Sequence, residues 1–594
     1  MKHSAIPDKP NHLPDASAVR IRLEHRTVII IFWMLALALG GLRAWATRYW
    51  IDPDTISYLD MADAYLRGDW PMALNGQWNP FYTWLLCLMQ LLAKPKPYWE
   101  FSAVHVLNFG IYVAGLACLH FFLLKLAHYN TYLSTQPAWQ GTVIIPPWAL
   151  FAFGYLLYIW TSLDLIGFNQ GADLCLANFV YLAFGLLCWI GTEHTHWKPF
   201  ALLGLVLGCG YLTKAMMLPL MFVFLAISMC LVADLRKALP RVMLALLVFV
   251  AVASPFIAAL SKSKGRFTFS DTGTDNYAFF VCMGSPHDSW LPPYFHWQGD
   301  IPNCGTPRHP TRRIYNTPAV YEFGTPFQAT YGAWYDPSYW YEGAVPHVNF
   351  RNQIHILRVH AEEYFKLFFG KQPALIVGLV ILGWMSWVWR YRANGSATQW
   401  LLLVPAVTAL SLYGIVHVEW RFIGAYFTIL WLGLYTGVRL PDSHDARSLL
   451  AGVIVSVVLA ASFSTILPKS LDDVRAIVHG QLGSNDVQVR VAKRLQELGM
   501  RPGDKVAAIG NTFLAFWARV ARVHIVAEIT PKDAPDYWQA DVATKARVRA
   551  VLASTGARAI VTDSLPKDDS DAHWQHIGDP SDKDARFYVC FLTR

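Results

Sequence analysis

Charged side chains are scarce in this chain. Asp, Glu, Lys and Arg make up 15% of its 594 residues, whereas 54% of the residues are hydrophobic. That balance excludes an ordinary soluble enzyme, because the apolar residues gather in runs close to the length that crosses a bilayer. The net charge of +8 is modest, and the basic residues lie in short loops between apolar runs, with no patch suited to nucleic acid. We therefore predict a membrane protein with many spans.

Several familiar signatures are also missing. The nine cysteines include no C-x-x-C pair, which argues against a thiolate zinc site or a redox motif. Neither G-x-G-x-x-G nor G-x-x-x-x-G-K-[ST] occurs, so nothing marks a nucleotide-binding domain. The histidines of the polar segment 262–371 lack the spacing of a ligand set: they are His287, His296, His309, His347, His355 and His360. We predict no cofactor and no metal site, and a divalent ion stays an open alternative.

The apolar runs predict eleven spans. These lie at residues 27–47, 99–125, 143–161, 171–191, 199–213, 215–233, 241–261, 372–390, 398–416, 422–438 and 448–467. The run 81–93 is too short to cross a bilayer, and we interpret it as an interfacial or re-entrant helix. This count places three basic loops on the side of the N-terminus (236–241, 390–392 and 439–447), as the positive-inside rule requires.

The span pattern divides the chain into three parts. Residues 1–26 form a basic tail, expected in the cytoplasm, and residues 27–467 form the membrane domain. Within that domain, 48–98 is an outer loop with juxtamembrane helices, and 262–371 is a long outer loop expected to act as a lid. Cys282 and Cys304 share this long loop, where a disulfide is possible.

Residues 468–594 predict a soluble α/β domain on the outer side. An amphipathic helix at 487–498 precedes four strand-like segments, at 505–510, 523–529, 559–562 and 587–592. The predicted fold class is thus a polytopic all-α membrane protein with juxtamembrane helices and a C-terminal α/β domain.

Four acids crowd into the start of the first outer loop: Asp52, Asp54, Asp60 and Asp63. Carboxylates close to hydrocarbon are costly and usually mark a site or a hydrated face. Asp52-Pro-Asp54-Thr is also a good helix start, so one of these two acids can cap the helix while the other takes part in chemistry. We expect Asp60 and Asp63 to face water from an amphipathic helix.

Further ionisable residues fall at span ends on the same side of the membrane: Asp173, Lys214, His417, Glu419 and Arg421. A carboxylate can take a proton from an attacking acceptor, and the cations can hold a phosphate that leaves. Plainer roles are open for each residue. Asp173 can cap the following span, Lys214 can snorkel, and Glu419 and Arg421 can pair only with each other.

The pattern Asp54-Thr-Ile-Ser-Tyr58, Arg67-Gly-Asp-Trp70 and Asn79-Pro80 resembles the first outer loop of the GT-C glycosyltransferases. It is similar to the lipid A aminoarabinose transferase and protein O-mannosyltransferase families within that superfamily. The resemblance extends to Gly171-Ala-Asp173-Leu, Leu212-Thr-Lys214 and His417-Val-Glu419-Trp-Arg421-Phe, and so covers most of residues 27–440. Asp52-Pro-Asp54 departs from the Asp-Glu pair of some members.

The resemblance implies an inverting glycosyltransferase in a bacterial inner membrane, with a cytoplasmic N-terminus and a periplasmic site and C-terminal domain. Its donor would be a sugar on a polyprenyl phosphate, and its acceptor a glycan, lipid or protein. Asp54 would be the general base, aided or replaced by Asp52. Tyr58, Asp173, Lys214, His417, Glu419 and Arg421 would bind substrate. The alternatives are a lipid or solute transporter, a non-catalytic envelope-assembly protein, and a polymerase or ligase that joins whole lipid-linked glycans.

Overall fold

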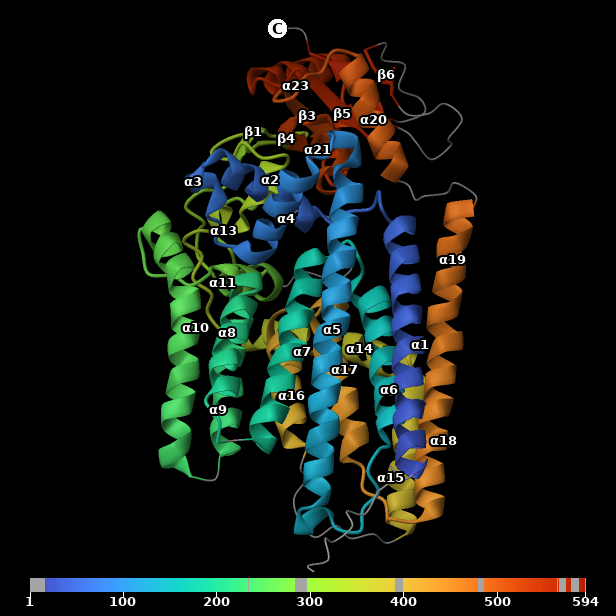
Figure 1. The fold of residues 1–594 in the computed structure, drawn as a ribbon. Helices are drawn as coiled ribbons and strands as arrows, with labels where there is room; N and C mark the ends of the chain where they lie inside the picture. The colour runs from blue at the N-terminus through green and yellow to red at the C-terminus, as the bar shows by residue number, and fades with distance from the viewer. Residues whose placement is uncertain are drawn as a thin grey trace, which may run out of the picture.

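The structure is a computed structural model, and it is mostly helical (Figure 1). It describes residues 16–193, 195–232, 234–283, 296–389, 399–478, 485–563, 565, 573–577 and 587–592, with side chains from residue 25 onward. Most of the predicted basic tail, the basic loop 390–392 and His287 therefore lie outside the described residues.

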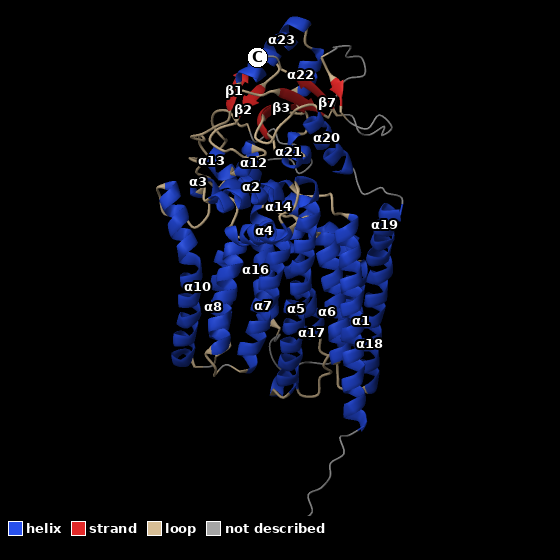
Figure 2. Ribbon diagram, turned by 45° about the horizontal axis from the view of Figure 1, so that its top comes forward, coloured by secondary structure: helices blue, strands red, loops and turns tan. Residues whose placement is uncertain are grey.

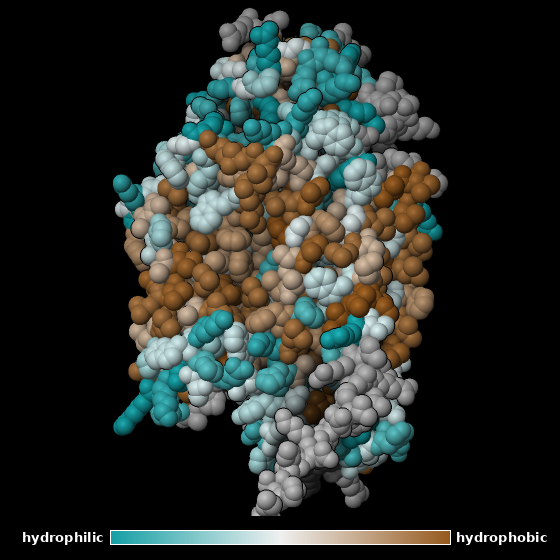
Figure 3. Space-filling view, viewed as in Figure 1, coloured by the Kyte–Doolittle hydropathy of each residue, from teal (hydrophilic) through white to brown (hydrophobic). Residues whose placement is uncertain are grey.

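A bundle of apolar helices forms the body of the molecule. Its members are α1 (Ala16–Ala46), α5 (Glu100–Ser134), α6 (Pro147–Trp160), α7 (Gly171–Thr192), α8 (Lys198–Thr213), α9 (Met217–Cys230), α10 (Leu235–Lys264), α15 (Pro373–Val388), α16 (Trp400–Val416), α17 (Trp420–Gly437) and α18 (His444–Ala461). Figure 3 shows one face of the molecule, on which apolar residues cover the bundle and polar residues gather at the two ends of the bundle. Side chains such as Met34 and Trp384 are exposed on that surface, whereas Trp160 and Trp431 are buried inside. Apolar residues thus face both outward and inward, as in a protein surrounded by lipid.

Each predicted span has a helix at its place, but the helices differ in length. Within the described residues, six helices are long and apolar enough to cross a membrane, or seven if the pair 350–371 and 373–388, bent by 81°, is one span. The helices α8, α9 and α16 are shorter apolar helices. The number of eleven spans therefore stays a prediction. The segment predicted as interfacial is α4 (Pro80–Ala93), also a short apolar helix.

Short helices cover one end of the bundle, which we call the domain end (Figure 1). They are α2 (Pro53–Arg67), α3 (Trp70–Ala73), α4, α11 (Thr272–Asn276), α12 (Gly332–Tyr335), α13 (Pro337–Trp340) and α14 (Phe350–Phe365). The helix α2 ends at Gly68, whose φ of 72° is left-handed and suits a residue without a Cβ. The first outer loop and the long loop 262–371 meet in this layer.

A seven-stranded sheet lies beyond this layer, with strand order β1-β2-β4-β3-β5-β7-β6 (Figure 2). The parallel centre consists of β3 (Lys505–Ile509), β4 (His524–Ile529) and β5 (Ala559–Thr562), and β7 (Tyr588–Phe591) and β6 (Gln575–His576) extend it antiparallel. Its helices are α20 (Asn485–Glu497), α21 (Phe516–Ala521), α22 (Ala534–Gln539) and α23 (Val542–Ser554). The predicted α/β fold of the C-terminal part is confirmed, with element boundaries close to those expected.

Two strands of this sheet come from the long loop. β1 (Arg312–Tyr315) and β2 (Val320–Glu322) form a hairpin, and β2 pairs antiparallel with β4, with Tyr321 opposite Glu528. The sheet therefore draws on both sides of the predicted boundary at residue 468. The first helix after that boundary, α19 (Leu467–Val478), packs against α1, where Arg43 Nη1 lies 2.5 Å from Asp473 Oδ1.

A disulfide joins Cys282 and Cys304 within the long loop, at the pair for which the sequence allows one. Cys282 ends a π-helical turn, Tyr277–Cys282, that follows α11. The bond ties this turn to the segment that leads into β1. The long loop is thus an ordered part of the domain end over its described residues.

Candidate active site

The start of α2 separates the roles of its two acids. Asp52 is the N-cap residue, and its Oδ1 accepts a hydrogen bond of 2.9 Å from the backbone N–H of Asp54. Pro53 occupies the first helical position, where the missing N–H costs nothing. Asp54 lies in the first turn, where the helix dipole favours a negative charge. Its side chain is left for contacts outside the helix.

Arg421, in the first turn of α17, lies at the centre of a cluster of acids. Its Nη1 is 3.0 Å from Asp54 Oδ2, 3.5 Å from Asp52 Oδ1 and 3.8 Å from Asp173 Oδ2. Its Nε donates to Glu419, two residues earlier in the chain. The hydrogen bonds that Arg421 makes in the part of the chain that the structure describes use Nε and Nη1.

Lys214 extends the cluster from the residue that follows α8. Its Nζ lies 3.0 Å from Asp173 Oδ1 and 4.9 Å from the ring centroid of Phe422. Asp173, near the start of α7, is 3% exposed, and neither of its oxygens makes a well-aligned hydrogen bond. Because Asp173 is held by charge alone, its position depends on Lys214 and Arg421.

The sequence analysis did not predict two residues of the cluster. Gln170 donates to Asp52 Oδ2 at 2.6 Å through Nε2 and accepts from Arg421 through Oε1. Trp334, in α12 of the long loop, donates from Nε1 to Asp54 Oδ1 at 3.0 Å. Gln170 directly precedes the Gly171-Ala-Asp173 motif and so had a signal in the sequence. Trp334 had none, because nothing in its local pattern connects it with α2.

His417 and Glu419 support Arg421 from the link between α16 and α17. His417 Nε2 lies 3.1 Å from Glu419 Oε1, and the His417 ring stacks on Phe280 with centroids 3.6 Å apart. Burial opposes ionisation of Glu419, but the adjacent Arg421 and His417 hold its pKa well below the ordinary value. Glu419 is therefore a permanent counter-charge to Arg421.

The pKa of Asp52 is shifted in the opposite direction from that of Glu419. Burial raises its pKa to about 7, the charge of Asp54 adds to this rise, and Arg421 only partly offsets it. Four carboxylates face two cations in the cluster, so a proton on Asp52 relieves part of the excess of negative charge.

Tyr58 lies one turn beyond Asp54 and is 2% exposed. Its ring packs between Trp78 and Tyr82, with centroids 5.5 and 5.3 Å away. Burial, together with the charges of Asp54 and Asp173, raises the pKa of Tyr58 well above its ordinary value, so the side chain stays neutral. It lies behind the cluster, within reach of its charges.

Of the two acids expected to face water, Asp60 is buried and Asp63 is only partly exposed. Asp60 is 8% exposed, and its oxygens accept from the N–H and hydroxyl of Thr330 at 2.8 and 2.9 Å and from Arg519 at 2.7 Å. Asp63 also contacts Arg519, at 2.7 Å. The expectation was wrong because the C-terminal α/β part covers this face of α2. The amphipathic pattern of α2 cannot predict a contact with a segment so distant in the sequence.

Among the described residues, no group of three or more His, Cys, Asp or Glu side chains has the arrangement of a metal-ligand set. The carboxylates of the cluster are instead directed at Arg421 and Lys214. What the arrangement offers chemically is a set of proton acceptors next to fixed cations, at the domain end of an apolar bundle.

No protein-family model matches the chain, and no curated protein does. Among solved structures, its fold is similar to that of ArnT from Cupriavidus metallidurans bound to undecaprenyl phosphate, with a TM-score of 0.47 and 13% sequence identity over 97% of this chain and 99% of that chain. It is also similar to an oligosaccharyltransferase from Archaeoglobus fulgidus in complex with Zn and sulfate, with a TM-score of 0.44 and 11% identity over 90% of this chain and 68% of that chain.

Proposed function

We propose that this protein is a membrane glycosyltransferase of the GT-C type. It transfers a sugar from a polyprenyl-phosphate donor to an acceptor at the domain end of the bundle and inverts the anomeric centre. The observation that carries the proposal is the contact of one guanidinium, Arg421, with acids at the starts of two separate helices, α2 and α7, beside a second cation on Lys214. The short motifs that resemble this superfamily contain Asp54, Asp173, Lys214 and Arg421, whereas Asp52 lies just outside them.

Asp54 acts as the general base. Its Oδ1 is oriented by the Trp334 indole and its Oδ2 by Arg421, so the carboxylate is held in one position. As the acceptor oxygen or nitrogen bonds to the anomeric carbon, its proton passes to Asp54. The bond between that carbon and the phosphate oxygen breaks at the same time, and its electron pair leaves with the phosphate. Asp52, the N-cap residue, aids or replaces Asp54.

Lys214 and Arg421 hold the phosphate of the donor. Lys214 uses one side of its ammonium group for Asp173 and keeps other donors free for an anion. The Nη2 group of Arg421 is a second donor, since the hydrogen bonds of Arg421 among the described residues use Nε and Nη1. Charge-assisted hydrogen bonds from both groups stabilise the negative charge that grows as the phosphate leaves. The polyprenyl tail then lies along the apolar surface of the bundle.

The remaining site residues orient these groups. Asp173 positions Lys214, His417 and Glu419 fix Arg421, and Gln170 links Arg421 to Asp52. We place the domain end in the periplasm of a bacterial inner membrane, with the N-terminus in the cytoplasm.

The test is the Asp54→Asn variant, assayed with the lipid-linked sugar that accumulates in a strain without this protein. Transfer should fall at least about 100-fold, while membrane insertion and the thermal unfolding midpoint stay as in the wild type. Asp445→Asn is the matched control, since Asp445 is exposed in the first turn of α18. Wild-type turnover in both Asp54→Asn and Asp52→Asn would overturn the proposal.

A further inference from the structure

A cavity lies at the domain end, apart from the Arg421 cluster. It has a volume of about 500 Å³, within the range of roughly 300–1,000 Å³ that is usual for ligand pockets. Its walls come from α3 and the residues next to it, the last turn of α10, and the 326–342 segment of the long loop. The Arg421 cluster consists of Arg421 and the residues around it: Asp52, Asp54, Gln170, Asp173, Lys214, Trp334, His417 and Glu419. None of these residues lines the cavity.

The cavity and the Arg421 cluster are neighbours through one short stretch of chain. Trp334 contacts Asp54, whereas Asp336, two residues later, lines the cavity. Between them the Tyr335 carbonyl accepts hydrogen bonds from Asn75 Nδ2 and Trp78 Nε1, at 2.7 and 3.1 Å. The two sites therefore share a rigid wall.

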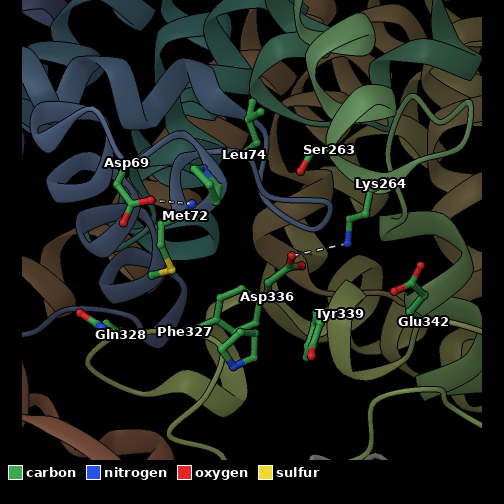
Figure 4. A pocket seen from close by; sticks show the side chains of 12 residues that line it. Asp69, Met72, Leu74, Ser263, Lys264, Phe327, Gln328, Asp336, Tyr339 and Glu342 are labelled. Carbon is green, nitrogen blue, oxygen red and sulfur yellow. Dashed lines mark hydrogen bonds and ion pairs between the residues drawn. The ribbon is translucent and has the colours of Figure 1, made fainter.

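A buried ion pair forms the floor of the cavity. Asp336 is 4% exposed, and the Nζ of Lys264 lies 3.6 Å from its Oδ2 (Figure 4). Lys264 also donates to Ser338 Oγ at 2.8 Å and lies 3.7 Å from Asp271. Its charge is thus already shared between two carboxylates.

Two more acids, Asp69 and Glu342, line the cavity, and Figure 4 shows them on opposite sides of Asp336. Asp69 accepts from the backbone N–H of Met72, at 3.4 Å, and Glu342 lies 3.2 Å from His309 Nε2 and 4.0 Å from Arg308 Nη1, on an exposed side chain outside the lining. Among the lining residues, three carboxylates against a single lysine disfavour an anion such as a phosphate. They favour a ligand that brings hydrogen-bond donors, because hydrogen bonds to an ionised carboxylate are strong.

The other walls suit a ring with apolar faces. Phe327 and Tyr339 pack edge to face with centroids 5.1 Å apart, next to Met72 and Leu74, and the Gln328 amide adds a donor and an acceptor. A sugar meets both requirements, because it has hydroxyl donors around the edge of a ring with apolar faces. An amino group on that sugar would add an electrostatic attraction to the acids.

We propose that this cavity is a carbohydrate-binding site that takes a neutral or amino sugar and excludes a phosphorylated one. The site is separate from the Arg421 cluster, and its existence does not depend on the proposed transfer reaction.

The experiment is ligand-observed NMR on the full-length protein in nanodiscs, with glucose, glucosamine and glucose 6-phosphate as probes. Glucosamine and glucose should give saturation-transfer signals, with glucosamine the stronger, and glucose 6-phosphate should bind at least tenfold more weakly. Glu342→Gln and Gln328→Ala should each weaken glucosamine binding at least threefold. Both side chains are partly exposed, and an unchanged unfolding midpoint would show that these variants fold.

Asp54→Asn and Asp445→Asn are the controls, and both should bind glucosamine as the wild type does. No sugar signal, glucose 6-phosphate binding equal to that of glucosamine, or binding unchanged in Glu342→Gln and Gln328→Ala would each overturn the assignment. Loss of sugar binding in Asp54→Asn would place the sugar at the Arg421 cluster and would also overturn it. Because this readout is binding alone, it is independent of whether Asp54→Asn loses transfer.

Discussion

Arg519 of α21 and Glu100, the first residue of α5, form a doubly bonded ion pair. The Nε and Nη2 atoms of Arg519 lie 2.9 and 2.7 Å from the two carboxylate oxygens. The Nη1 atom lies 2.7 Å from Asp60 and from Asp63, on α2. Since Arg519 is 2% exposed and Glu100 is fully buried, this network joins the α/β part to the helix that carries Asp54.

Removal of Arg519 should therefore be costly. Arg519→Met leaves Asp60 without a cation and leaves Glu100 and Asp63 with Arg522 alone, at 2.8 and 3.4 Å. Breaking a buried pair in this way costs roughly 3–5 kcal/mol. The thermal unfolding midpoint should fall clearly and transfer should weaken, because α2 loses its anchor. Arg494→Met is the matched control, since the Arg494–Glu497 pair is exposed and such pairs contribute about 1 kcal/mol at most. Equal shifts in both variants would show that the buried network does not hold the parts together.

The raised pKa of Asp52 predicts a pH dependence of stability. Because the folded state holds the Asp52 proton up to about pH 7 and the unfolded chain loses it near pH 4, stability should fall between these values and level off above. Asp52→Asn carries no titrating group but retains an acceptor for the cap. Its unfolding midpoint should rise relative to the wild type at pH 8 more than at pH 5, in calorimetry across that range. A difference that does not change with pH would contradict the assignment.

The same proton should appear in the kinetics. The wild-type kcat/KM should increase as pH rises through about 7, when Asp52 loses its proton. In Asp52→Asn this neutral limb should disappear, because the carboxyl group that loses a proton near pH 7 has been replaced by an amide. A profile with the same neutral limb in both proteins would assign it to another group.

The hydrogen bond from Trp334 should orient the Asp54 carboxylate for proton transfer without contributing to substrate binding. Trp334→Phe removes the indole N–H and keeps an aromatic ring beside Trp78 and Phe513. A hydrogen bond to a charged group contributes about 1.5–3 kcal/mol, so kcat should fall roughly tenfold or more while KM for the donor changes little. Trp384→Phe, on the exposed apolar surface, is the control. A rise in KM alone would make Trp334 a substrate contact.

Lys214 should act on the donor. Lys214→Met removes one of the two proposed phosphate ligands, and the KM for the lipid-linked donor should rise roughly tenfold or more. Lys214→Arg should restore part of the affinity, and Lys237→Met, at an exposed site, should have no effect. An unchanged KM in Lys214→Met would remove Lys214 from the phosphate site and leave it as a partner of Asp173.

The sequence predicted the fold class and most residues of the candidate site, because both rest on local signals. Apolar runs identify helices, and Asp52-Pro-Asp54 identifies a helix start whatever surrounds it. The partners of these residues could not be predicted. Trp334 reaches Asp54 across 280 positions of the sequence, and Arg519 reaches Asp60 across 459. Such contacts are set by how loops and domains pack, and a single sequence carries no pattern for that.

The same reason explains the long loop. Its short strands β1 and β2 have little periodicity of their own, and they become strands because the edge of β4 offers hydrogen-bond partners. The segment was expected to act as a lid, which stays a prediction, and part of it belongs to a sheet.

The pairing of β2 with β4 also sets an order of assembly. Tyr321 and its partner Glu528 are 207 positions apart, and the helices α15, α16, α17 and α18 are synthesised between them. During translation the backbone N–H and C=O groups on the outer edge of β2 therefore have no strand to pair with until those helices have been inserted and β4 has been synthesised. A nascent chain halted before residue 524 would therefore present an open strand edge, a surface that chaperones and proteases can recognise as unfinished.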